Sequence, residues 1–162
     1  MSTSTHYSIG LEAKKLHKWA KKTALNVVKD YRARRVQPAS RIVLAFTGMS
    51  GTTLATALSL AIYELTAGKI VTNQVYVRKQ GEDSHGYMCE YTDDVNFKRD
   101  YVLFVDDFVD TGATAARVLH ELNYSFTTDH SAEIDGMVLQ KSSLVQKFER
   151  HDGCEFDHGV YG

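Results

Sequence analysis

The stretch YVLFVDDFVDTGATAARVL, residues 101–119, joins an apolar segment to a cluster of acids and then to a turn of small residues. Residues 101–105 form a continuous apolar run, which is typical of a strand covered on both faces. Asp106, Asp107 and Asp110 follow, and the next four residues are TGAT. One acid before a helix is explained by N-capping, but carboxylates this close repel one another, a cost that cations or hydroxyl donors would offset. The stretch therefore predicts a ligand site where a buried strand meets a helix.

Around this stretch, apolar segments of strand length alternate with helical patterns. Helices are expected over residues 11–35, 52–67 and 114–123, and strands over residues 41–46, 75–79, 86–91, 101–105 and 133–140. The first helix carries an apolar stripe at three- and four-residue steps, formed by Leu16, Trp19, Leu25, Val28 and Tyr31. This alternation predicts an α/β fold with three layers and a mainly parallel sheet. Ligands on such sheets bind at the carboxyl ends of the strands, where the turns at 47–53 and 106–114 are both expected.

The composition is that of a globular protein. With 162 residues, 43% of them hydrophobic and 24% charged, the chain fits a single domain over residues 1–162. A net charge of −1 gives no sign of binding to nucleic acid or to a membrane surface. Cys89 and Cys154 match no zinc or disulfide pattern, and the N-terminus lacks the apolar core of a signal peptide. These features favour a reducing, cytoplasmic location.

Two other acidic motifs share part of this pattern. Asp106, Asp107 and Asp110 satisfy the DDxxD signature of prenyl-diphosphate enzymes, but those carboxylates project from a helix, whereas residues 101–105 have strand composition. A haloacid-dehalogenase nucleophile requires DxDx[TV], which Phe108 breaks. The remaining interpretation uses the whole stretch, because backbone N–H groups at a helix start suit a phosphate monoester and the carboxylates before it suit vicinal hydroxyls. A ribose bearing a 5′-phosphate matches both features.

The segment VLFVDDFVDTGAT, residues 102–114, resembles the phosphoribosyl-pyrophosphate (PRPP) motif of the type I phosphoribosyltransferases. The family's pyrophosphate loop is matched after the first core strand by Gly48, Met49, Ser50 and Gly51. The mobile lid of orotate phosphoribosyltransferases is matched by Arg78, Lys79 and His85, without the lysine usually found between them. The matched core runs from about residue 41 to residue 139, which leaves residues 1–40, residues 140–162 or both for a variable hood over the base.

The resemblance implies a Mg²⁺-dependent enzyme that joins PRPP to a nucleobase and releases pyrophosphate. Asp106 and Asp107 would hold the ribose hydroxyls, directly or through Mg²⁺. The remaining PRPP contacts are assigned to Thr111, Gly112, Ala113 and Thr114 for the 5′-phosphate, to residues 48–51 for the pyrophosphate, and to Arg78, Lys79 and His85 for neutralising it. A cytoplasmic homodimer is expected.

Asp110 bears on the acceptor base. The 6-oxopurine enzymes of the family usually carry aspartate at this place in the motif, whereas orotate and adenine enzymes tend to carry threonine or alanine. The motif therefore favours a 6-oxopurine acceptor and purine salvage, while the lid favours orotate or another pyrimidine. A regulator of the same fold that senses PRPP or nucleotides without turnover is a third alternative.

Overall fold

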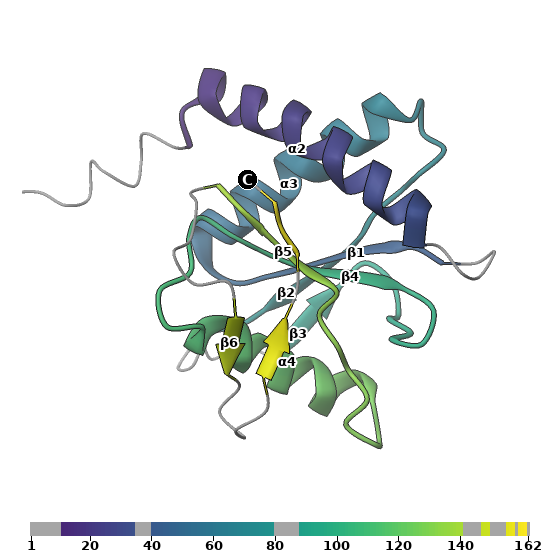
Figure 1. Ribbon diagram of the computed structural model, residues 1–162, viewed down its shortest axis with the longest axis vertical. Coiled ribbons are helices and arrows are strands. Elements are labelled where there is room, and N and C mark those ends of the chain that lie inside the picture. Colours follow the sequence, from purple (N-terminus) through teal and green to yellow (C-terminus); the bar gives the residue numbers. More distant parts are fainter. Residues whose placement is uncertain are drawn as a thin grey trace, which may run out of the picture.

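The computed structural model describes residues 11–34, 40–79, 88–140, 147–149, 155–157 and 159–161. Within these ranges, one six-stranded sheet has the order β3-β2-β1-β4-β5-β8, and its pairings are parallel except that of β2 with β3. Its strands are β1 (Ile42–Phe46), β2 (Asn73–Val77), β3 (Cys89–Tyr91), β4 (Tyr101–Asp106), β5 (Gly136–Leu139) and β8 (Gly159–Tyr161). Helices α2 (Ala13–Arg34) and α3 (Gly48–Leu65) cover one face, and α4 (Ala113–Phe126) covers the other (Figure 1). The predicted three layers and mainly parallel sheet are confirmed.

Strand β1 shows why the apolar runs are continuous. All five of its residues are buried. Ile42 and Leu44 belong to the core under α2 and α3, whereas Val43 and Ala45 belong to the core under α4. Because helices cover both faces of the sheet, neither side of the strand can be polar.

Helix α2 packs into the core beside α3. Trp19 and Tyr31 are buried in the cluster that α2 shares with α3 and β1, with 9% and 4% of their surface exposed. The expected apolar stripe is wrong at Leu25, whose side chain is 58% exposed. The buried stripe runs through Ala24 and Val28. Leu25 follows Ala24 and therefore points about 100° around the helix axis from it, toward solvent.

Several element boundaries differ from the sequence prediction. Residues 48–51, expected as a turn, are the first turn of α3. Residues 133–135, expected in a strand, precede β5, and there the Asp135 carboxylate accepts a 2.7 Å hydrogen bond from the N–H of Val102. Three short strands were not predicted, namely β8 and the antiparallel pair β6 (Lys147–Glu149) and β7 (Glu155–Asp157). None of the helices in the described ranges is both long enough and apolar enough to cross a lipid bilayer.

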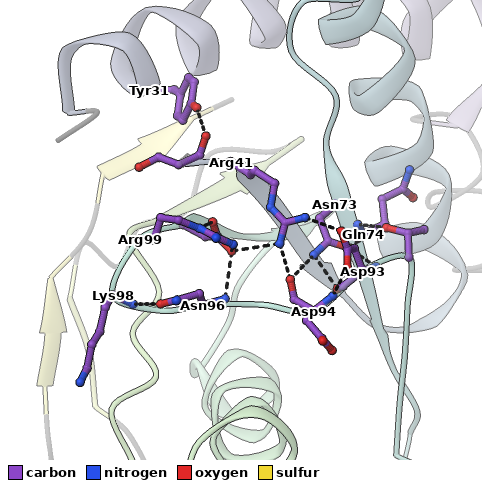
Figure 2. A network of polar contacts seen from close by, with 12 residues as sticks. Tyr31, Arg41, Asn73, Gln74, Asp93, Asp94, Asn96, Lys98 and Arg99 are labelled. Atoms are coloured by element: carbon purple, nitrogen blue, oxygen red, sulfur yellow. Dashed lines mark hydrogen bonds and ion pairs between the residues drawn. The ribbon is translucent and has the colours of Figure 1, made fainter. Parts of the chain in front are cut away.

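A network of charged and amide groups lies at the amino edge of the sheet (Figure 2). Arg41 donates to the Asp93 carboxylate at 2.7 Å and to the backbone carbonyl of Asp94, and it lies 3.5 Å from Asp100. The buried Asp100 carboxylate also accepts a 2.9 Å hydrogen bond from Arg99. Asn73 links this network to β2 by donating to the carbonyl of Asp93 at 2.7 Å. These charged groups are therefore mostly paired within the protein and tie the strand starts together, although Nε of Arg41 is buried without a partner among the described residues.

Candidate functional site

The order in which the strands are added to the sheet reverses between β1 and β4, because β2 lies on one side of β1 and β4 on the other. From β1 the chain passes through α3 to β2 on one side, while β4 lies on the other side of β1 and leads into α4 on the opposite face. At such a switch point, the segments leaving the carboxyl ends of the two central strands diverge and open a crevice. The segments in question are 47–51 after β1 and 106–114 after β4.

A cavity of about 490 Å³ occupies this crevice. It is lined by Thr47, Gly48, Met49, Ser50, Lys79, Asp106, Asp107, Thr114 and Arg117. The two segments that the sequence singled out therefore meet at the carboxyl edge, as predicted. Both are helix starts, so α3 and α4 direct N–H groups and the positive ends of their dipoles toward the same space.

The acidic turn holds its carboxylates in fixed positions. The N–H of Asp107 donates to Oδ1 of Asp106 at 2.8 Å, and the N–H of Phe108 donates to Oδ1 of Asp107 at 2.9 Å. Burial raises the pKa of Asp106 to about 7, the neighbouring Asp107 carboxyl adds to this increase, and Lys79 acts against it. A cation or a hydroxyl donor in the cavity would relieve this desolvation and repulsion.

The turn into α4, residues 111–114, is the cradle that the resemblance assigns to a 5′-phosphate. Gly112 is the N-cap of α4 with a φ of +88°, in the left-handed region that glycine adopts without steric cost. The Thr111 hydroxyl accepts a 3.2 Å hydrogen bond from the N–H of Ala113. A hollow of about 220 Å³ is lined by residues 106–115, so it includes Thr114 and also Asp110, whose side chain is exposed.

Lys79 lies against the pyrophosphate-loop candidate from the sequence. Gly48 has a φ of +69°, and a Cβ added there would lie 2.8 Å from Cε and 3.1 Å from Nζ of Lys79. A side chain at this position would be strained by the positive φ and would push the end of the exposed Lys79 side chain aside. Met49 and Ser50 line the same cavity. Gly51, the fourth residue of α3, is buried and does not line it.

Arg78, another candidate lid residue, does not line the cavity. The Arg78 guanidinium forms an ion pair with Glu90 on β3, and the Arg78 N–H donates to the carbonyl of Met88 at 2.7 Å. Arg78 therefore faces the antiparallel edge strand. His85 and the rest of the expected lid, residues 80–86, lie outside the described residues.

Arg117 and Thr47 line the cavity and were missed by sequence reasoning. Arg117 donates through Nη1 to the carbonyl of Arg78 at 2.7 Å and through Nη2 to Oγ1 of Thr47 at 3.1 Å. A faint signal exists, because Arg117 lies four residues after Ala113 and so shares the helix face of the first residue of α4. Nothing at Thr47 distinguishes it from an ordinary residue at a helix start.

The donor set suits Mg²⁺ only together with a ligand. Within the described ranges, no group of three or more His, Cys, Asp or Glu side chains is arranged to hold a metal ion. Mg²⁺ is commonly held by one or two carboxylates together with substrate phosphates and water. Asp106 and Asp107, side by side in a cavity with room for a polar ligand, fit that pattern.

Comparison with known proteins identifies the fold. No sequence family and no curated protein matches the chain. Among solved structures, it is similar to the orotate phosphoribosyltransferase of Francisella tularensis, with a TM-score of 0.59, 18% identity, and coverage of 93% of this chain and 66% of that one. It is also similar to the hypoxanthine phosphoribosyltransferase of Trypanosoma cruzi, with a TM-score of 0.56, 14% identity, and coverage of 92% of this chain and 78% of that one. The chain thus spans about two thirds to four fifths of the length of these two proteins and has their fold.

Proposed function

We propose that this protein is a phosphoribosyltransferase that transfers the 5-phosphoribosyl group of PRPP to a nucleobase and releases pyrophosphate. One observation carries the proposal: the starts of α3 and α4, two carboxylates and a lysine all line a single cavity at the switch point of the sheet. PRPP offers matching groups, with phosphates at both ends of a ribose that carries two hydroxyls.

The acidic turn and the cradle after it would bind the ribose 5-phosphate part of PRPP. Asp106 and Asp107 accept hydrogen bonds from the ribose hydroxyls, and residues 111–114 bind the 5′-phosphate at the start of α4. Asp106 and Asp107, together with ligand oxygens, would hold Mg²⁺, which would supply positive charge beside the diphosphate. The carboxylates also stabilise the positive charge that develops on the ribose ring as the anomeric C–O bond breaks.

The start of α3 and Lys79 would bind the leaving group. Breaking the anomeric bond transfers an electron pair to the pyrophosphate oxygen, so fixed positive groups there lower the barrier. Residues 48–51 supply backbone N–H groups, and Lys79 supplies a charge directly over Gly48. For Arg78 to join them, as the lid hypothesis requires, its ion pair with Glu90 would have to open.

The proposed acceptor is a 6-oxopurine, with Asp110 as the base that takes its proton. Asp106 and Asp107 are committed to ribose, whereas the exposed Asp110 carboxylate stands at the rim of the same turn. A carboxylate within hydrogen-bond reach of a ring nitrogen contributes typically about 10²–10⁴-fold to the rate. Orotate is the second candidate, favoured by the Arg78–Lys79 pair that resembles an orotate lid. The proposal extends to a cytoplasmic homodimer acting in purine salvage.

Initial rates of nucleotide formation test the function and the acceptor together. Wild type and Asp110→Asn are mixed with PRPP, Mg²⁺ and one base at a time: guanine, hypoxanthine, xanthine or orotate. We expect transfer to at least one 6-oxopurine, and at least a hundredfold lower rate in the variant. Transfer to orotate alone, or an unchanged rate in the variant, would overturn the purine assignment. No transfer to any base, with PRPP still bound, would favour the non-catalytic sensor.

A further inference from the structure

Arg117 lies at the point where three segments of the site come together. It projects from the second turn of α4, and its guanidinium contacts the residue after β1 and the residue after β2. The bond from Nη1 to the carbonyl of Arg78 fixes the backbone immediately before Lys79. The bond from Nη2 to Thr47 fixes the residue immediately before Gly48. Arg117 therefore sets the relative position of the two residues that meet across the cavity.

Its hydrogen-bonding capacity is only partly used. A guanidinium carries five N–H donors, and two of them are accounted for by Thr47 and Arg78. No carboxylate in the described part of the chain forms an ion pair with Arg117. A half-buried arginine that lines a cavity without an internal counter-charge favours an anion in that cavity.

We infer that Arg117 binds the diphosphate of PRPP and positions Lys79 and the start of α3 around it, an inference that rests on the proposed function. Its unused N–H groups are donors to the diphosphate oxygens, since a planar fork matches phosphate geometry. Its two existing bonds hold Thr47 and the Arg78 carbonyl in place. Lysine would substitute only in part, because one ammonium lacks the fork that bridges two fixed acceptors and still presents donors to a ligand.

Two partial ligands separate this role from a general structural one. Inorganic pyrophosphate occupies only the subsite of Gly48, Lys79 and Arg117, whereas ribose 5-phosphate occupies only the acidic turn and the cradle at residues 111–114. A residue that merely stabilises the fold would affect both ligands alike. Arg117 should affect pyrophosphate alone.

The experiment is isothermal titration of each ligand, in the presence of Mg²⁺, into wild type and four variants. Arg117→Gln should weaken pyrophosphate binding by about 10- to 100-fold, the usual worth of hydrogen bonds to a charged group. Arg117→Lys should lose about tenfold and Thr47→Val about threefold, because each keeps part of the arrangement. Arg32→Gln, which removes the same charge from the exposed end of α2, should bind as wild type does. Ribose 5-phosphate should bind all five proteins equally.

The inference is overturned if Arg117→Gln binds pyrophosphate as tightly as wild type, or if it loses both ligands equally. Should Arg117→Gln fail to fold by circular dichroism, Thr47→Val decides, because undiminished pyrophosphate binding there contradicts the positioning role. Failure of wild type to bind either ligand would instead remove the proposed function, and this inference with it.

Discussion

The two edges of the central sheet use charged residues in opposite ways. At the amino edge, the Asp100 carboxylate pairs with both Arg41 and Arg99, and Arg41 also donates to Asp93 (Figure 2). At the carboxyl edge, Asp106 and Lys79 face a cavity, and burial holds the pKa of Asp106 well above its usual range. Charges that are satisfied internally stabilise the fold, whereas charges held at an energetic cost beside a cavity mark a binding site. The comparison therefore predicts activity losses at one edge and stability losses at the other.

The largest expected effect is on catalysis at the carboxyl edge. Replacing Arg78 and Lys79 together with alanine should lower the transfer rate by about 10²–10³-fold, because positive charge at the leaving group is lost. The free energy of unfolding should fall by about 1–2 kcal/mol, because the Arg78 side chain, which is removed together with its ion pair to Glu90, is only 11% exposed. The matched control removes Lys29 and Arg32 from the exposed face of α2. The transfer rates of the variant and the control are measured at saturating PRPP. Equal rates would contradict the assignment of Arg78 and Lys79 to the leaving group.

The next effect is on stability at the amino edge. Asp100→Ala removes a fully buried carboxylate and leaves Arg41 and Arg99 without their shared partner. Breaking such a pair from one side costs roughly 3 kcal/mol here, at the low end of the usual range because the arginines are partly exposed. Urea denaturation should show the loss, while PRPP affinity of the folded variant stays that of wild type. A variant of normal stability would mean that the network contributes nothing.

Ionisation of the Asp106 carboxyl should lower the free energy of unfolding. The unfolded residue loses its proton near pH 4, whereas the folded residue has a pKa of about 7. Between these values the unfolded chain binds fewer protons, so the free energy of unfolding falls as pH rises. Asp106→Asn removes this titration and should exceed wild type in stability by on the order of 2 kcal/mol at pH 8, with little difference at pH 4. Denaturation midpoints that differ equally at both pH values would contradict this origin.

The smallest expected effect is a difference between Gly48, the first residue of α3, and Gly68, which lies three residues after the end of α3. Gly48 and Gly68 both have positive φ, +69° and +79°, so alanine at either should cost about 1 kcal/mol. Only at Gly48 would the new Cβ collide with Lys79. Gly48→Ala should therefore also weaken PRPP binding several-fold, whereas Gly68→Ala should not. Equal PRPP affinity in the two variants would separate Gly48 from the site.

Features set by apolar patterns along the chain could be predicted from the sequence, whereas contacts between distant polar residues could not. Strands β1 and β4 were recognised because their helices cover both faces, which forces an unbroken apolar run. The meeting of residues 48–51 with the acidic turn followed from parallel topology alone. Arg117 could not be predicted, because its contacts with Thr47 and Arg78 join residues 70 and 39 positions apart in the chain. Strands β6 and β7 have three residues each, too few for a periodic pattern to distinguish them from a loop.

The carboxyl edge is proposed to bind PRPP through Asp106 and Asp107. Calorimetric titration of PRPP in the presence of Mg²⁺ tests it most directly, with wild type beside the double variant Asp106→Asn, Asp107→Asn. We predict saturable binding at one site per chain in wild type, and a loss of at least about a hundredfold in affinity in a double variant that remains folded. Equal affinity of the two proteins for PRPP, or no binding to wild type, would contradict the claim.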